Sequence, residues 1–143
     1  MTEPNKALVA RYIEEVWNGG SLLALERLTS EGFAYHLGGQ PPQDRQAMGQ
    51  FLQMVHSAFP DWHVEIEEMV ADETLVCARW QGPATHKGPF HGIPPTGKSV
   101  KVSGMNLYQI EDGRIVKEWE QMDSLGMLMQ LGVLPPPTHP EAP

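Results

Sequence analysis

The chain has 143 residues, of which 41% are hydrophobic, and a formal net charge of −8 at pH 7. This length suits one domain with a buried core, and the acidity argues against the basic surface that nucleic-acid binding requires. No apolar run is long enough to span a membrane, and no signal-peptide pattern opens the sequence. The single cysteine, Cys77, allows no internal disulfide and fits the reducing cytoplasm. We therefore expect one domain over residues 1–134 and a Pro-rich, disordered tail over 135–143.

The N-terminal part of the chain predicts three helices. Apolar residues recur at helical spacing from Leu8 to Trp17, until Gly19-Gly20 ends the helix. Ser21 caps a short second helix, and Asp44 caps a third that ends at Pro60-Asp61. A short extended piece is expected between the second and third helices, over 31–36.

The pattern then changes to the alternation of strands. A half-buried strand is expected over 62–67 and three long strands over 75–85, 99–110 and 114–123, with a Gly- and Pro-rich loop over 86–98. A short helix over 124–131 follows. Helices followed by antiparallel strands predict an α+β fold. A curved antiparallel sheet over three N-terminal helices would enclose a cavity, and its convex face would need a cover such as a second copy of the chain.

The dipeptide Asp112-Gly113 predicts a two-residue type I′ hairpin turn. Counting back from this turn pairs Asn106 with Trp119, and alternation then assigns residues to faces. One face is predicted to carry Asn106, Tyr108, Ile110, Ile115, Trp119, Gln121 and Asp123. The opposite face would carry Val116, Glu118, Glu120 and Met122 and contribute to an interface. This register predicts a pocket floor whose single acid is Asp123.

Asp123 has two interpretations. It can cap the helix that begins at Ser124, or it can act as an acid/base whose pKa is raised by an apolar pocket. His36, His86 and His91 can donate hydrogen bonds to a substrate or anchor loops. Asn106 and Gln121 can contact a ligand or tie down a loop.

Aromatic residues are either core or the wall of a site for a flat apolar ligand; they include Trp62, Trp80, Phe90, Tyr108 and Trp119. No HxH or HExxH spacing is present, so no metal site is expected. No P-loop or dinucleotide motif is present either, so no cofactor is expected.

Several motifs occur in order between Asn5 and Gly132: AFPD, THKGPFHGIPPTGK, DGRIVKEW and WEQMDSLGMLMQLG. With them the chain resembles the SnoaL-like polyketide cyclase, or ester cyclase, family. The resemblance implies a cone-shaped α+β fold shared with nuclear transport factor 2, a dimer or higher oligomer, and cofactor-free aldol ring closure of a polyketide. It also implies that Asp123 is the acid/base, and it matches His36 and His86 to recurring histidines. Asn106, Gln109 and His91 depart from the family pattern, which indicates a different substrate.

The resemblance gives the leading hypothesis. Asp123 would move the proton, while Asn106, Gln121 or His86 would stabilise the oxyanion. The substrate would contact the side chains of His36, Trp62, Trp80, Phe90, His91, Tyr108, Trp119 and Gln121. An isomerase or hydrolase on the same fold, and a non-catalytic protein that binds an apolar ligand, remain alternatives.

Overall fold

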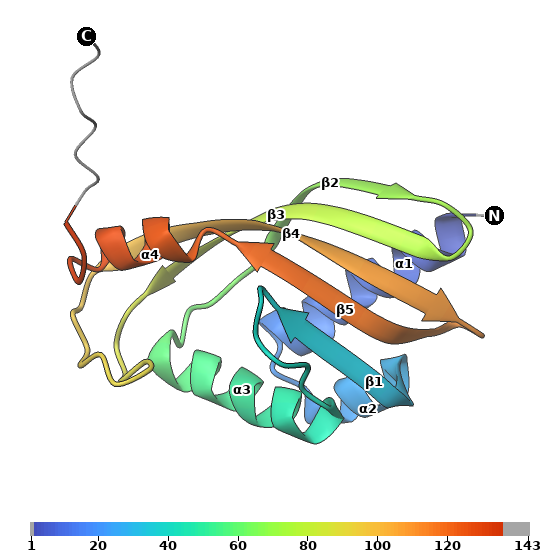
Figure 1. The fold of residues 1–143 in the computed structure, drawn as a ribbon, viewed down its shortest axis with the longest axis horizontal. Coiled ribbons are helices and arrows are strands. Elements are labelled where there is room, and N and C mark those ends of the chain that lie inside the picture. Colours follow the sequence, from blue (N-terminus) through green and yellow to red (C-terminus); the bar gives the residue numbers. More distant parts are fainter. Residues whose placement is uncertain (1, 136–143) are drawn as a thin grey trace, which may run out of the picture.

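The computed structural model describes residues 2–135, and it places the helices of the N-terminal part on one face of a curved sheet (Figure 1). The helices are α1 (Glu3–Tyr12), a π-helix continuing it (Ile13–Asn18), α2 (Leu22–Leu28), α3 (Arg45–Ala58) and α4 (Ser124–Gln130). Ser21 and Asp44 accept hydrogen bonds from the backbone N–H groups of Ala24 and Ala47, so both predicted N-caps are confirmed. None of the described helices is long and apolar enough to cross a membrane.

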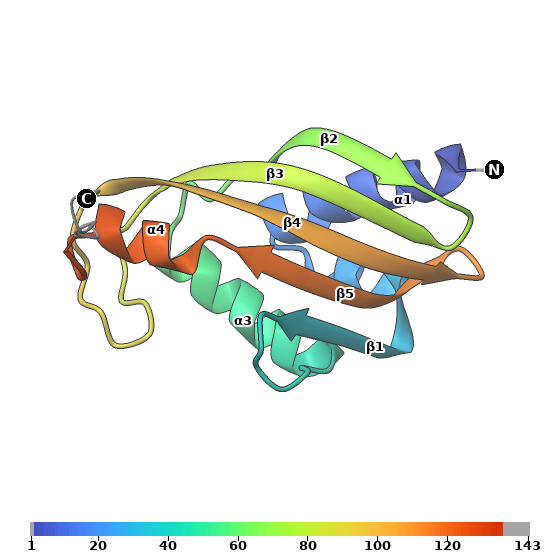
Figure 2. The same cartoon turned by 45° about the horizontal axis from the view of Figure 1, so that its top comes forward.

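The strands are β1 (Thr29–Leu37), β2 (Glu65–Ala71), β3 (Leu75–Thr85), β4 (Ser99–Glu111) and β5 (Arg114–Met122), in the spatial order β1-β5-β4-β3-β2 (Figure 2). The α+β prediction is confirmed. The expectation of a purely antiparallel sheet is wrong, because β1 runs parallel to β5. Such pairing needs a long connection, which α3 and the three intervening strands supply.

The core lies between the concave face of the sheet and the helices. Tyr12 from α1, Leu52 from α3 and Ile115 from β5 are each 0% exposed there. Strand β2 begins at Glu65, so Trp62 and Val64 precede the strand in which they were predicted. Both side chains still pack against the core.

The hairpin between β4 and β5 decides which residues face this core. Asp112 and Gly113 have φ values of 51° and 72°, as a type I′ turn requires, and Ile110 pairs with Ile115. The next pair is Gln109 with Lys117, so Val116 forms a β-bulge. One extra residue reverses the faces of every residue beyond it.

The predicted faces of β5 beyond the bulge are therefore wrong. Asn106 pairs with Glu120, not with Trp119. Glu118 and Glu120 point into the core, whereas Trp119 and Gln121 belong to the outer face. The two glutamates that were assigned to an outer interface are the buried acidic residues of the described part of the chain.

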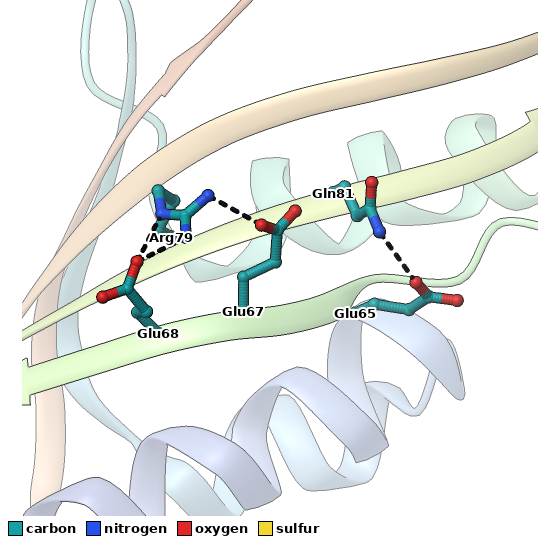
Figure 3. A network of polar contacts seen from close by, with 5 residues as sticks. All are labelled: Glu65, Glu67, Glu68, Arg79 and Gln81. Atoms are coloured by element: carbon teal, nitrogen blue, oxygen red, sulfur yellow. Dashed lines mark hydrogen bonds and ion pairs between the residues drawn. The ribbon is translucent and has the colours of Figure 1, made fainter.

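The outer face of β2 and β3 carries a polar network (Figure 3). Arg79 Nη1 lies 2.6 Å from Glu67 Oε2, and the same guanidinium also pairs with Glu68. Gln81 donates to Glu65 at 3.2 Å. Exposed ion pairs contribute little to stability, so this network serves mainly as the polar margin of the outer face. Of the tail predicted to be disordered, residues 136–143 lie outside the described part of the chain.

Candidate active site

Two buried carboxyl groups lie side by side on the inner face of β5. Glu118 is 0% exposed and Glu120 is 5% exposed. The amide nitrogen of Asn106, on the neighbouring strand β4, donates to Glu118 at 2.7 Å and to Glu120 at 3.1 Å. Trp80 Nε1 donates to the amide oxygen of Asn106 at 2.8 Å. An indole N–H can only donate, so Trp80 fixes the orientation of the amide that joins this carboxylate pair.

Glu118 is surrounded by donors. Besides Asn106, it accepts hydrogen bonds from the Tyr12 hydroxyl at 2.6 Å and from Trp17 Nε1 at 3.0 Å. Burial raises the pKa of Glu118, and the hydrogen bonds from these donors act in the opposite direction. Three donors to one carboxylate favour its ionised form, so we assign the negative charge of the pair to Glu118.

Glu120 has fewer partners. Its Oε1 accepts from the Tyr35 hydroxyl at 3.0 Å and from Asn106, and no hydrogen bond among the described residues reaches its Oε2. Burial, followed by the neighbouring charge of Glu118, raises the pKa of Glu120 to about 7. A carboxyl with a pKa near neutrality can both accept and return a proton at physiological pH.

The surrounding phenols remain donors. Burial raises the pKa values of Tyr12, Tyr35 and Tyr108 well above their usual range, and the charges of the carboxylate pair act in the same direction. All three hydroxyls therefore stay protonated near neutral pH and add no charge to the site.

Glu120 borders a small cavity of about 10 Å³, which we call the inner cavity. Such a volume is close to that of one oxygen atom or one water molecule. Its wall includes Trp17, Trp62, Trp80, Asn106 and Tyr108. A carboxyl with a pKa near neutrality thus borders a small aromatic space.

A larger cavity of about 430 Å³, the outer pocket, lies between the ends of β1 and β5, α3, α4 and the loop over 86–98. This volume is in the range of small-molecule sites. Its apolar wall is formed by Leu37, Phe51, Phe90, Met122, Met127 and Leu128. His91 is the one ionisable side chain of its lining, beside Gln40, Gln121 and Ser124.

Phe51 connects the outer pocket to the hydrogen-bond partners of the carboxylate pair. Its ring lines the outer pocket and lies 6.4 Å from the ring of Trp17 and 6.0 Å from that of Tyr35, measured between centroids. Trp17 donates to Glu118, and Tyr35 donates to Glu120. A chain of aromatic contacts therefore runs from the outer pocket through Phe51 to the residues that bind the buried acids.

Asp123 lies outside both cavities and is exposed. Its Oδ1 accepts from the backbone N–H of Gly126 at 2.9 Å, so the N-cap interpretation is confirmed. Its side chain borders a separate surface depression together with Arg79 and Met105. Its predicted catalytic role stays a prediction, without the apolar surroundings on which that prediction depended.

The other predicted residues fall into groups. Trp62, Trp80, Asn106 and Tyr108 line the inner cavity; Phe90, His91 and Gln121 line the outer pocket. His36 stacks on Trp119, with 5.6 Å between ring centroids, away from both cavities. His86 is 0% exposed, stacks on Phe59 and hydrogen-bonds to Thr96 at 3.0 Å, so it anchors the loop over 86–98.

Sequence reasoning missed Glu118 and Glu120. A signal was present: Ile115 and Val116 are adjacent apolar residues, which breaks the alternation expected of a half-buried strand. Such a pair is compatible with a bulge, which moves both glutamates to the inner face. Among the described residues, no group of three or more His, Cys, Asp or Glu side chains is placed to hold a metal ion.

Comparison with known proteins places the chain in a family. The sequence model of the SnoaL-like polyketide cyclase family matches residues 7–131 of this chain. The chain belongs to the SnoaL-like polyketide cyclase family. A comparison with curated proteins finds no match.

Solved structures of similar proteins agree with this assignment. IdmH from Streptomyces antibioticus, a candidate polyketide cyclase, is 31% identical, with 90% of this chain and 98% of that chain covered and a TM-score of 0.79. AclR from Streptomyces galilaeus, a candidate hydroxylase, is 28% identical, with 99% and 87% covered and a TM-score of 0.83. A candidate polyketide cyclase from Acidithiobacillus ferrooxidans is 29% identical, with 91% and 95% covered and a TM-score of 0.79. Similar chains thus carry more than one assigned activity.

Proposed function

We propose that this protein is a cofactor-free enzyme that closes a ring in a polyketide-like substrate, with Glu120 as the acid/base. The observation that carries the proposal is the position of Glu120: a buried carboxyl with a pKa of about 7 that borders an aromatic cavity. Family membership supports the substrate class. In this proposal Glu120 has the acid/base role that the sequence analysis predicted for Asp123.

The proposed reaction is an intramolecular aldol addition. The Glu120 carboxylate takes a proton from a carbon next to a carbonyl, and the electrons of that C–H bond form an enolate. The enolate carbon then attacks a second carbonyl of the same molecule, forming a C–C bond and an alkoxide. Glu120 returns its proton to the alkoxide, so the enzyme ends in its starting state.

The neighbours of Glu120 have supporting roles. Glu118 is held by three donors, and its charge adds to burial in raising the pKa of Glu120. The amide nitrogen of Asn106 donates to both carboxyls, so Asn106 positions the pair and has no N–H bond left for a substrate oxygen. The rest of the substrate occupies the outer pocket, and its reacting end reaches Glu120 when the Phe51 ring turns aside.

The proposal is tested by comparing Glu120→Gln with Asp123→Asn. Aromatic 1,3-diketones serve as test substrates in D₂O. NMR then measures how fast their C–H hydrogen is exchanged for deuterium, which reports on the first step without the natural substrate. We expect Glu120→Gln to slow exchange by about 10²- to 10⁴-fold and Asp123→Asn to leave it nearly unchanged. The reverse result would restore Asp123 as the acid/base.

A non-catalytic ligand-binding protein is the second candidate. It is favoured by one observation: the outer pocket has an apolar wall, and Glu120 is not part of its lining. In that case aromatic ligands raise the melting temperature, no exchange is catalysed, and neither substitution changes binding. An isomerase that moves a proton within one substrate would use Glu120 in the same way, and its product would distinguish it from a cyclase.

We also propose that a second copy of the chain covers the outer face of the sheet. Paired residues form a continuous row across the outer face: Val70, Cys77, Leu107, Trp119 and His36. Val70 is 65% exposed and Leu107 is 36% exposed, although both are apolar. An isologous dimer would bury this row against its own copy.

We further propose that the protein acts in the cytoplasm. The free thiol of Cys77 suits such a reducing compartment.

A further inference from the structure

The loop over 86–98 forms a tight turn at the edge of the outer pocket. Phe90 and Ile93 exchange two backbone hydrogen bonds, of 3.0 and 2.8 Å. Between them, His91 and Gly92 have φ values of 47° and 78°. Positive φ at both central residues is the type I′ conformation, in which Asn, Asp or Gly is preferred at the first of the two positions. The turn does not require a histidine there, so its imidazole needs another explanation.

Packing holds this turn in place. The Phe90 ring lies 5.2 Å from that of Phe59, which stacks on the buried His86 with 5.3 Å between centroids. His86 hydrogen-bonds to Thr96 at 3.0 Å, which ties the two ends of the loop together. The His91 ring lies 4.3 Å from the Phe90 ring in an edge-to-face arrangement. The imidazole therefore rests against an anchored ring, and a ligand that binds it pays little for ordering the loop.

The lining of the outer pocket contains one basic side chain and no acidic one. His91 is its one ionisable residue, and the other polar side chains belong to Gln40, Gln121 and Ser124. Within the described part of the chain, none of these four side chains takes part in a hydrogen bond, so all are available to a ligand. A mainly apolar pocket with a single basic group is complementary to an apolar ligand with a single acidic group.

The charges around the pocket have the same sign. Residues 74–110 contain no Asp or Glu, although the chain has 18 acidic residues in all. The loop itself carries Lys87 and Lys98 on either side of His91. The carboxyl of Asp123 accepts a backbone hydrogen bond as a helix cap and borders a different depression. In a protein with a formal net charge of −8, this pocket is thus bordered by a segment that attracts anions.

We propose that the outer pocket binds an aromatic or apolar ligand with one acidic oxygen, and that the His91 imidazole donates a hydrogen bond to this oxygen. An N–H donor bound to an anionic oxygen forms a charge-assisted hydrogen bond, which is stronger than one to a neutral oxygen. The inference rests on the proposed function in making this ligand the substrate, with His91 as a specificity-determining residue. The oxygen can belong to a carboxylic acid or to an enolised 1,3-diketone, and the experiment distinguishes the two.

The test compares two ligands of nearly the same shape, 2-naphthoate and 2-naphthamide, by calorimetry at pH 7. We expect the wild type to bind the naphthoate about tenfold more tightly. His91→Asn introduces a residue that the turn prefers, so it should fold at least as well as the wild type. It should remove most of the preference for naphthoate and leave the affinity for naphthamide unchanged. Lys87→Gln is the matched control, because it removes a charge from the same loop outside the pocket lining, and it should keep the preference.

Two further measurements locate the ligand and identify its acidic group. The C–H NMR signals of the His91 ring, identified by their absence from the spectrum of His91→Asn, should shift when naphthoate is added. A naphthyl 1,3-diketone and the corresponding naphthyl monoketone form a second pair of ligands. A larger preference within this pair than within the first assigns the oxygen to an enolised diketone, and the reverse assigns it to a carboxylic acid.

The inference is overturned if the wild type binds the members of each pair equally, or if His91→Asn keeps the preference. It is also overturned if Lys87→Gln loses as much of the preference as His91→Asn, because the overall charge of the loop would then be the cause. Failure of the proposed function looks different. Glu120→Gln then leaves the rate of C–H exchange unchanged, while the preference for acidic ligands, measured at equilibrium without turnover, persists.

Discussion

Glu118 and Glu120 share the amide nitrogen of Asn106, which donates to the first at 2.7 Å and to the second at 3.1 Å. The two carboxyls occupy alternate positions of β5, on the same buried face. Because they compete for one donor group and repel each other when both are ionised, they titrate as a coupled pair. This relationship sets the charge of the site, and the first two predictions follow from it.

Removal of the shared amide should weaken the fold. We expect Asn106→Leu to lower the free energy of unfolding by about 3 kcal/mol, because Glu118, Glu120 and Trp80 all lose a buried hydrogen bond. Urea denaturation at pH 7 measures the change. Gln109→Leu on the same strand is the matched control, since the Gln109 side chain makes one long, exposed hydrogen bond, of 3.5 Å, within the described part of the chain. Equal losses in the two variants would contradict the bridging role of Asn106.

The stability of the protein should depend on pH through Glu120. Its pKa is raised from 4.5, the ordinary value that it has in the unfolded chain, to about 7 in the folded protein. Between these values the folded state binds more protons than the unfolded state, so the free energy of unfolding falls as pH rises from 4.5 to about 7. The stability lost over this range is roughly 3 kcal/mol, because each tenfold change in proton affinity corresponds to about 1.4 kcal/mol.

The Glu120→Gln variant isolates this effect. Its stability relative to the wild type should increase as pH rises from 4.5 and should level off above the Glu120 pKa of about 7. Denaturation curves in urea at several pH values measure this difference. Asp123→Asn, at an exposed carboxyl, is the control and should follow the wild type. Parallel curves for Glu120→Gln and the wild type would mean that Glu120 has an ordinary pKa.

Asp123 should prove to be a structural cap. We expect Asp123→Ala to lower the free energy of unfolding by about 1 kcal/mol, because the backbone N–H of Gly126 loses its acceptor. Asp123→Asn keeps an acceptor and should cost much less. Thermal denaturation compares the two variants. Equal stability of the alanine variant and the wild type would show that the cap contributes nothing to folding.

Phe51 should control access from the outer pocket to the carboxylate pair. Phe51→Ala removes the ring that packs on Trp17 and Tyr35, so the two cavities should merge. We expect larger aromatic ligands to bind more tightly, as titration calorimetry would measure. Phe90→Ala is the control, because Phe90 also lines the outer pocket but packs on Phe59 instead. The same gain in both variants would mean that Phe51 is part of the wall and not a partition.

The outer face of the sheet should mediate dimer formation. In an isologous dimer Leu107→Glu would place a new charge in the interface, so we expect sedimentation to show monomers. Leu23→Glu is the control, since Leu23 lies on α2 and is 56% exposed. A Leu107→Glu variant that sediments like the wild type would exclude this face as the interface.

The sequence by itself determined the elements and the turn. Local signals decided them: helical spacing up to Trp17, the caps Ser21 and Asp44, and the positive φ values that Asp112-Gly113 can adopt. These signals act over a few residues, so a single sequence carries them. The motifs also indicated the family, which the family model confirms.

Only the tertiary structure decided which acids lie in the site. Val116 adds one residue to β5, and this single bulge exchanges the inner and outer faces of the strand beyond it. Glu118 and Glu120 are tolerated inside because Tyr12, Tyr35 and Asn106, from three other elements, donate hydrogen bonds to them. A buried charge needs donors that lie far away in the sequence, and only the fold brings them together.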